Sequence, residues 1–240
     1  MKRSLLVISL FVSPVQAEIV DSIEKFTDIF GVSFSKDIDG STVTTLDASY
    51  DVTEKLRVFG DIDTESNWEA GIGYSFWQGE GYYTENSLKI SDGKYSTGIF
   101  IAKSLHEKWV AIGDVNYNNK KQIADPFCGS ESTCGGNHLN VIAHPSDSVD
   151  YSIGAMWSPI ELFDLVYKFN HEVGLKENYI SFDKPITVND ERLSRSYGKT
   201  NYHYHEAIVY LNAKYIRPSI TYTYFEGGQD YIEFGLTFDF

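Results

Sequence analysis

Hydrophobic and polar residues alternate along most of this chain, in runs close to the roughly 9–11 residues of a tilted membrane-spanning strand. Period-two alternation indicates β-strands with one apolar face, and turn stretches such as DIDGS and QGEG separate the runs. We count twelve candidate strands, although residues 82–104 alternate poorly and a count of ten stays open. The last strand carries apolar side chains on every second position: Ile232, Phe234, Leu236, Phe238 and Phe240.

The links between the candidate strands are sorted by length. Numbered from the first strand, the even-to-odd links are all short, as in VTEKL, LHEKW and SPIEL, whereas the odd-to-even links include the long segments 118–148 and 174–200. Bacterial outer-membrane barrels place short turns on the periplasmic side and long loops outside. A soluble sandwich has no reason to sort its links in this way. The pattern therefore predicts an all-β fold, a transmembrane antiparallel up-and-down β-barrel with two long extracellular loops.

The N-terminal stretch MKRSLLVISLFVSPVQA has the three regions of a secretory signal peptide. A basic pair is followed by a short apolar run and then by small residues at the positions that a signal peptidase reads. We predict a signal peptide over residues 1–17 and a barrel over residues 18–240. Residues 18–29 carry apolar side chains at helical spacing and form either a periplasmic lead-in or an insert into the lumen.

The terminal strand with its final phenylalanine resembles the assembly signal of Gram-negative outer-membrane β-barrel proteins. In that family the C-terminal strand closes the barrel and is read by the barrel-assembly machinery. The resemblance implies the outer membrane as the location, with its lipid and lipopolysaccharide as partners. In size the chain is similar to small porins, which include porins for acidic oligosaccharides with arginine-lined walls. Few basic residues face inward here, so the resemblance does not extend to that substrate.

Opposite the apolar face, the alternation places charged residues on the lumen side. The candidates are the acids Asp47, Asp61, Glu69, Glu85, Asp114 and Glu233 and the bases Arg57, Lys89 and Lys168. In a chain of net charge −14, an acidic water-filled path favours small neutral or cationic solutes and repels anions, and the same charge argues against a nucleic-acid partner. Inward glycines such as Gly73 and Gly98 leave room for this path. The alternative is a plugged lumen, because a barrel of about twelve strands lies between filled barrels of about eight strands and open porins of about sixteen strands.

One long loop holds Cys128 and Cys134, which we expect to form a disulfide in an oxidising compartment. The disulfide either shapes a surface for recognition or pore constriction, or protects the loop from proteolysis. His203 and His205 share one strand face and could hold a metal with Glu206 or Glu172 nearby. No third ligand has a defined spacing, so we expect no metal and no cofactor.

Three functions fit this architecture. The first is a small porin-like channel for passive diffusion of small neutral or cationic solutes. The second is a closed barrel whose loops serve surface binding or a structural role. The third, an outer-rim hydrolase, needs a nucleophile, a histidine and a carboxylate together. The rim residues of these types, for which no motif fixes the geometry, are Asn170, His171, Glu172, Ser194 and Ser196. We therefore expect that the chain is not an enzyme.

Overall fold

The computed structural model describes most of the chain. The described residues are 30–36, 42–79, 81–126, 140–182, 187–188, 191–192, 194–213, 215–226 and 230–238. The predicted signal peptide, residues 18–29, Cys128, Cys134 and Phe240 lie outside them. Within the described ranges, no helix has the length and apolar character needed to cross a membrane.

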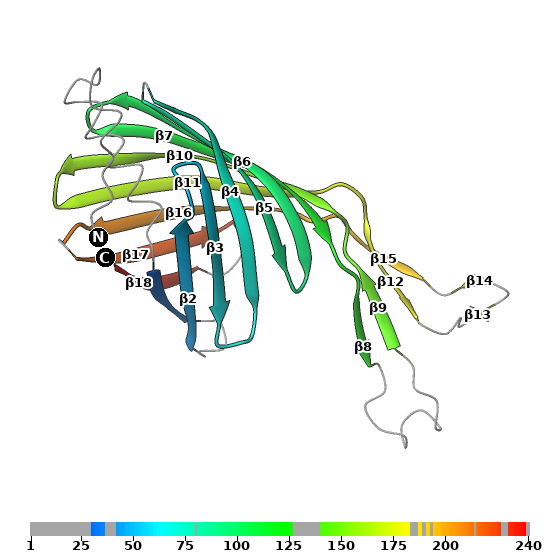
Figure 1. Ribbon diagram of the computed structural model, residues 1–240. Helices are drawn as coiled ribbons and strands as arrows, with labels where there is room; N and C mark the ends of the chain where they lie inside the picture. Colours follow the sequence, from blue (N-terminus) through cyan, green and yellow to red (C-terminus); the bar gives the residue numbers. More distant parts are fainter. Residues whose placement is uncertain are drawn as a thin grey trace.

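Among the described residues, twelve antiparallel strands close into a barrel (Figure 1). They are β1 (Phe30–Lys36), β2 (Thr42–Asp51), β3 (Leu56–Asp63), β4 (Trp68–Gly79), β5 (Tyr82–Ser91), β6 (Lys94–His106), β7 (Trp109–Lys120), β10 (Ser148–Ile160), β11 (Phe163–Gly174), β16 (Asn201–Leu211), β17 (Ile216–Phe225) and β18 (Tyr231–Phe238). Each strand pairs with the barrel strands before and after it, an up-and-down order. The poorly alternating strands β5 and β6 pair along most of their length. The count of twelve is therefore confirmed, and the count of ten is wrong.

The first and last strands close the barrel. In the β1–β18 pair, Phe30 lies opposite Phe238 and Phe34 opposite Phe234, and the rings of Phe30 and Phe238 are 6.1 Å apart. Lipid offers no hydrogen-bond partners, so a spanning sheet is stable only when no strand edge is left unpaired. The terminal strand closes the barrel as its pattern predicts, whereas its recognition by the assembly machinery stays a prediction.

Large apolar side chains cover the outer face of the barrel. On β18, Ile232 and Phe234 are 49% and 56% exposed. On β10, Ile153 is 65% exposed while the adjacent Ser152 is buried. The alternation therefore separates an apolar outer surface, suited to lipid, from an inner surface that is largely polar.

The links β2–β3, β6–β7 and β10–β11 lie at one end of the barrel, which we call the short-turn end; the other is the long-link end. Near the short-turn end, register shifts interrupt β4, β6 and β10. The shift in β4 lets Phe76 and Trp77 both face outward. Trp109 and Trp157, on the paired strands β7 and β10, stack with ring centroids 5.6 Å apart. Bulges are common at barrel rims, and Trp favours the level where lipid meets water, so these features mark one membrane interface.

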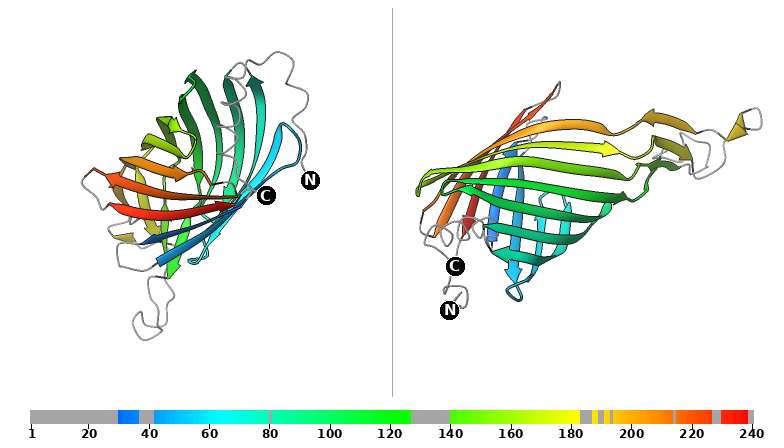
Figure 2. Two further views of the ribbon diagram at one scale, coloured as in Figure 1. Left: turned by 90° about the vertical axis from the view of Figure 1, so that its left-hand side faces the viewer. Right: turned by 90° about the horizontal axis from the view of Figure 1, so that it is seen from above.

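Four barrel strands continue beyond the long-link end as a second sheet, which we call the projecting sheet (Figures 1 and 2). Its strands are β8 (Ile123–Pro126), β9 (Asn140–His144), β12 (Asn178–Phe182) and β15 (Arg195–Gly198). They adjoin β7, β10, β11 and β16 in the chain, and their order in the sheet repeats the order of those barrel strands. A separate small sheet pairs β13 (Thr187–Val188) with β14 (Glu191–Arg192). The segments expected as loops thus contain strands. The sequence did not predict these strands, because runs of four or five residues contain too few alternations to be recognised.

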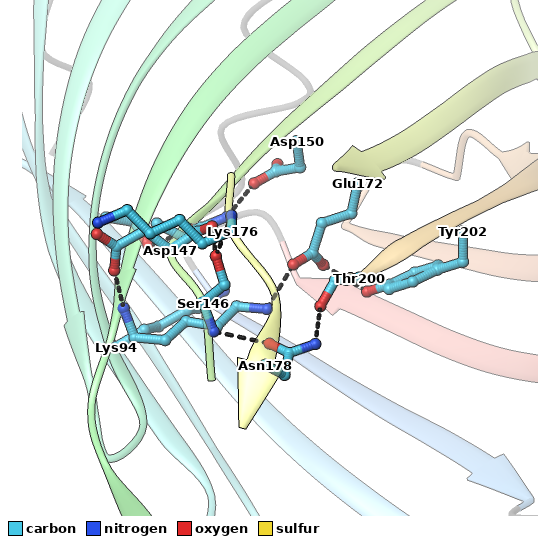
Figure 3. A network of polar contacts seen from close by, with 12 residues as sticks. Lys94, Ser146, Asp147, Asp150, Glu172, Lys176, Asn178, Thr200 and Tyr202 are labelled. Carbon is cyan, nitrogen blue, oxygen red and sulfur yellow. Dashed lines mark hydrogen bonds and ion pairs between the residues drawn. The ribbon is translucent and has the colours of Figure 1, made fainter. Parts of the chain in front are cut away.

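A buried polar network joins the projecting sheet to the barrel (Figure 3). Asn178 accepts a hydrogen bond from the backbone N–H of Ser146 (2.7 Å), and it donates to the backbone oxygen of Gly198 (3.0 Å) and the hydroxyl of Thr200 (3.3 Å). The Ser146 hydroxyl in turn accepts the backbone N–H of Lys176 at 2.7 Å. Ser146 and Asn178 are buried. One asparagine therefore ties together the chain segments that leave β10, β11 and β16.

We expect Asn178→Ala to loosen the projecting sheet without opening the barrel. The substitution removes the three hydrogen bonds of the amide, and an unpaired buried donor costs about 1–3 kcal/mol. Limited proteolysis should cleave the segments 121–147 and 175–200 several times faster, while heat-modifiable migration of the barrel on gels is unchanged. Tyr197→Ala, at an exposed position on the same sheet, is the control. Equal cleavage of Asn178→Ala and the wild type would show that the network does not hold the sheet.

We expect Phe234→Arg to weaken folding of the barrel in lipid. Phe234 faces outward and lies between Phe34 on β1 and Ile220 on β17. An arginine on the lipid face near the bilayer midplane costs about 2–4 kcal/mol. Equilibrium unfolding in vesicles measures this loss, with Glu233→Arg, the same new side chain on the adjacent inward position, as the control. A smaller loss for Phe234→Arg than for Glu233→Arg would mean that the two faces are assigned the wrong way round.

Candidate functional site in the barrel lumen

A cavity of about 460 Å³ lies against the inner faces of β2, β3, β5, β6 and β7. Its lining includes six of the nine predicted lumen residues. They are Asp47, Arg57, Asp61, Glu85, Lys89 and Asp114. The aromatic side chains of Phe59, Tyr83 and Phe100 also line it. The pairing of the strands brings these residues together from positions that are widely separated in the sequence.

Each of the three predicted basic residues is held by a carboxylate. Arg57 lies 3.1 Å from Asp51 and 3.7 Å from Glu85. Lys89 Nζ lies 3.1 Å from Glu69. The remaining pair joins Lys168 Nζ to Glu206 Oε2 at 2.7 Å. These cations therefore offer little uncompensated positive charge to a passing anion.

Three carboxylates form a row across neighbouring strands. Asp47 lies directly opposite Asp61, and Asp61 lies directly opposite Glu69. Glu69 is compensated by lysine, but within the described residues no cationic nitrogen lies within 4.0 Å of Asp47, Asp61 or Glu233. Like charges placed opposite one another destabilise a sheet, and unpaired carboxylates avoid a large desolvation cost only in contact with water. The row therefore places acidic side chains next to one another on the inner wall, and Asp47 and Asp61 have no cationic partner among the described residues.

The opposite sector of the wall carries a ladder of amides, hydroxyls and carboxylates. Asn116 donates to Asp114 and to Asp150, both at 2.9 Å. Asn118 also donates to Asp150, and Ser152 donates to Asp114. Asp114 therefore has neutral hydrogen-bond donors as partners, and the ladder gives this sector fixed polar side chains.

Nearer the long-link end, Glu172 accepts hydrogen bonds from Lys120 and from Tyr202, both at 2.5 Å (Figure 3). These contacts join β7, β11 and β16 on the lumen side.

The inward glycines do not leave empty space. A Cβ atom at Gly98 would collide with the side-chain oxygen of Asn116, and one at Gly73 would lie 2.6 Å from the Glu85 carboxyl carbon. The expectation that these glycines open the lumen is wrong. They make room for the large polar side chains of neighbouring strands.

Toward the short-turn end, the inner face changes from polar to apolar. Buried apolar side chains from β6, β7, β10, β11 and β16 form one cluster, which we call the apolar layer: Ala102, Val110, Ile112, Met156, Val166 and Ile208. Tyr83, Phe100 and Tyr210 pack against it. The sequence analysis did not predict this layer, because it assigned the apolar residues of each strand to the lipid-facing side alone. The signal is visible in WVAI, at 109–112, and in AIVY, at 207–210, where both faces of a strand are apolar.

His171 and His205 lie on the other side of the wall from the carboxylates of the lumen. Tyr151 Oη lies 2.7 Å from His171 Nδ1, and Tyr167 Oη lies 2.7 Å from His205 Nδ1, among exposed residues of the outer face. Glu206, by contrast, pairs with the lumenal Lys168. His203 and His205 therefore do not share a side of the wall with Glu206, and His203 contacts Glu226 instead. Within the described residues, no group of three or more His, Cys, Asp or Glu side chains is arranged to hold a metal ion.

The same alternation separates the rim residues of the hydrolase alternative that lie on β11. His171 faces outward, where its second ring nitrogen lies 2.8 Å from Asn201 Oδ1. Asn170 donates to Glu206 at 3.1 Å on the inner side, and Glu172 bonds to Lys120 there. Consecutive residues of a strand point to opposite faces, so β11 does not bring this histidine and this carboxylate together.

The solved structures that this fold is similar to include two small porins. The rhombohedral crystal form of the NanC porin matches with a TM-score of 0.57 at 9% identity, over 88% of this chain and 100% of that chain. The KdgM porin in complex with disordered oligogalacturonate matches with a TM-score of 0.55 at 9% identity, over 88% of this chain and 99% of that chain. No protein-family model matches the sequence, and a search of curated proteins gives no match.

The closed antiparallel barrel with an apolar outer face defines the class of the fold: it is a membrane β-barrel of the kind found in Gram-negative outer membranes. Within that class its architecture resembles the small porins NanC and KdgM. The expected resemblance to small porin-like barrels is confirmed at the level of the fold.

Proposed function

We propose that the chain is a small outer-membrane channel for passive diffusion of small neutral or cationic solutes. The observation that carries the proposal is the cavity of about 460 Å³ bordered by Asp47 and Asp61, two inward carboxylates without a cationic partner among the described residues. Such a wall attracts cations into a narrow space and repels anions. The similarity of the fold to porins supports a channel.

The wall chemistry argues against an acidic oligosaccharide as the solute. The KdgM porin has been solved with oligogalacturonate, a polyanion. In this chain Arg57, Lys89 and Lys168 are each engaged by a carboxylate, so they do not form an open basic track. Neutral and cationic solutes are therefore the better match.

The proposal includes an orientation and a set of partners. By the usual arrangement of bacterial barrels, the short-turn end faces the periplasm and the projecting sheet extends to the outside of the cell. The outer surface then contacts outer-membrane lipid and lipopolysaccharide. The terminal strand is the segment that the barrel-assembly machinery reads during insertion. Neither a cofactor nor a catalytic residue enters this function.

We expect Asp61→Lys to shift the ion preference of the channel away from cations. The new ammonium replaces one charge of the acidic row and lies opposite Glu69. Local potentials of a few kT change counter-ion concentration tenfold or more, so the cation-to-anion permeability ratio should fall by at least about threefold. Reversal potentials of single channels under a salt gradient measure this ratio. Glu107→Lys, in the turn between β6 and β7, is the control; an unchanged ratio in a conducting Asp61→Lys barrel would place Asp61 outside the ion path.

One observation favours a second function, surface binding. The projecting sheet is built from four strands and fixed by a buried network. A channel does not require an ordered sheet of this kind beyond the barrel, whereas a binding surface does. If binding is its role, replacing residues 121–147 and 175–200 by short turns should abolish attachment of phage or ligand to intact cells. Conductance of the shortened barrel should then stay close to that of the wild type. Retained attachment would remove this candidate.

A further inference from the structure

The boundary between polar and apolar side chains lies at one level on several neighbouring strands. On β6 and β7, the polar position Asp114 pairs with Phe100, and the next inward pair is Ala102 with Ile112. A similar step occurs between β11 and β16. There, Lys168 pairs with Glu206, and the next inward pair toward the short-turn end is Val166 with Ile208. Such a step at matched register produces an apolar band on the inner wall across β6, β7, β10, β11 and β16.

The apolar layer is dry. Met156 is 1% exposed and Val166 is 2% exposed, although their side chains face inward at the same alternate positions as the polar residues of the lumen. An open, water-filled tube would leave inward side chains in contact with solvent. The side chains at this level therefore cover one another and exclude water.

Two aromatic residues connect the layer with the acidic cavity. Tyr83 and Phe100 line the cavity and also pack against the layer, with their rings edge to face at 6.1 Å. The Tyr83 hydroxyl is fixed, since it donates to Glu85 (2.7 Å) and accepts from Ser75 (2.9 Å) and Arg57 (3.3 Å). The aromatic pair thus forms the floor of the cavity.

Polar groups return on the far side of the layer. Asp164, which is buried, accepts hydrogen bonds from Ser158 (2.6 Å) and Asn212 (2.8 Å) and lies 3.9 Å from Arg217. Arg217 also stacks on Tyr210, at 4.1 Å from the ring centroid. The inner wall is therefore polar, then apolar, then polar along the barrel axis.

We infer that the apolar layer, together with Tyr83 and Phe100, is the constriction that limits flow through the lumen. Apolar constrictions between polar vestibules control conduction by excluding water, and hydrated ions cross them only after the band becomes wet. The inference rests on the proposed channel function and names the residues that regulate it. Ion preference then resides in the acidic row, and the rate of passage resides in the apolar layer.

Val166→Thr tests this inference with little change in side-chain shape. The hydroxyl lets water enter the layer without creating a large cavity, so single-channel conductance or open probability in planar bilayers should rise on the order of twofold or more. Val209→Thr is the matched control, because Val209 lies next to Ile208 but faces outward with 41% exposure. Heat-modifiable migration on gels confirms that each variant is folded.

Phe100→Ala is a second variant that opens the floor from the cavity side. Its control is Ile101→Ala, the next residue of β6, which faces lipid with 47% exposure. We expect Phe100→Ala to raise conductance and to admit larger neutral sugars in a liposome-swelling assay. This variant keeps the inference testable if the threonine variant fails to fold.

The outcomes separate the constriction from the channel. Higher currents in Val166→Thr and Phe100→Ala than in the wild type and the two controls support the inference, and so does conduction by these variants when the wild type is silent. Equal currents in all five folded proteins overturn the constriction and leave the channel in place. Silence from all five overturns the channel itself, and the constriction with it.

Discussion

Inside a bilayer, each backbone N–H and C=O must find its partner within the protein, and the rest of this structure depends on that requirement. It forces β18 to pair with β1, and closure fixes the register of all twelve barrel strands. Because side chains alternate along each strand, a fixed register decides which residues face one another across the inner wall. The opposition of Asp47, Asp61 and Glu69 is thus a consequence of hydrogen bonding between backbones.

The two parts of the lumen have opposite relations to water. Hydration stabilises the charged form of carboxylates that have no cationic partner, so water beside the acidic row favours its charged state. The apolar layer gains stability by expelling water, at roughly 25 cal/mol for each Å² of apolar surface removed from it. Tyr83 stands between the two, with its ring on the layer and its hydroxyl among Arg57, Ser75 and Glu85. A solute that moves along the axis therefore leaves a region that stabilises charge and enters one that does not.

The sequence predicts the outer face of this barrel better than its interior. Lipid contact requires an apolar residue at every second position, so the strands and their facing could be read from alternation alone. Register shifts, such as the one that turns both Phe76 and Trp77 outward, interrupt the period-two pattern, and alternation alone does not place them.

The interior depends on contacts between distant strands. The pairing of Lys168 with Glu206, or the filling of the space above Gly98 by Asn116, follows from register, which one sequence does not contain. The apolar layer escaped prediction because apolar residues such as Val166 and Ile208 are expected to face lipid in a membrane strand, and here they face inward.

The continuity of the projecting sheet with the barrel has a mechanical consequence. The strands that adjoin the projecting sheet, β7, β10, β11 and β16, also carry Val110, Met156, Val166 and Ile208 near their other ends. Strands in a hydrogen-bonded sheet resist stretching and sliding, so a load applied to the projecting sheet is borne along these strands. A force at one end of the molecule therefore acts on the packing of side chains at the opposite end.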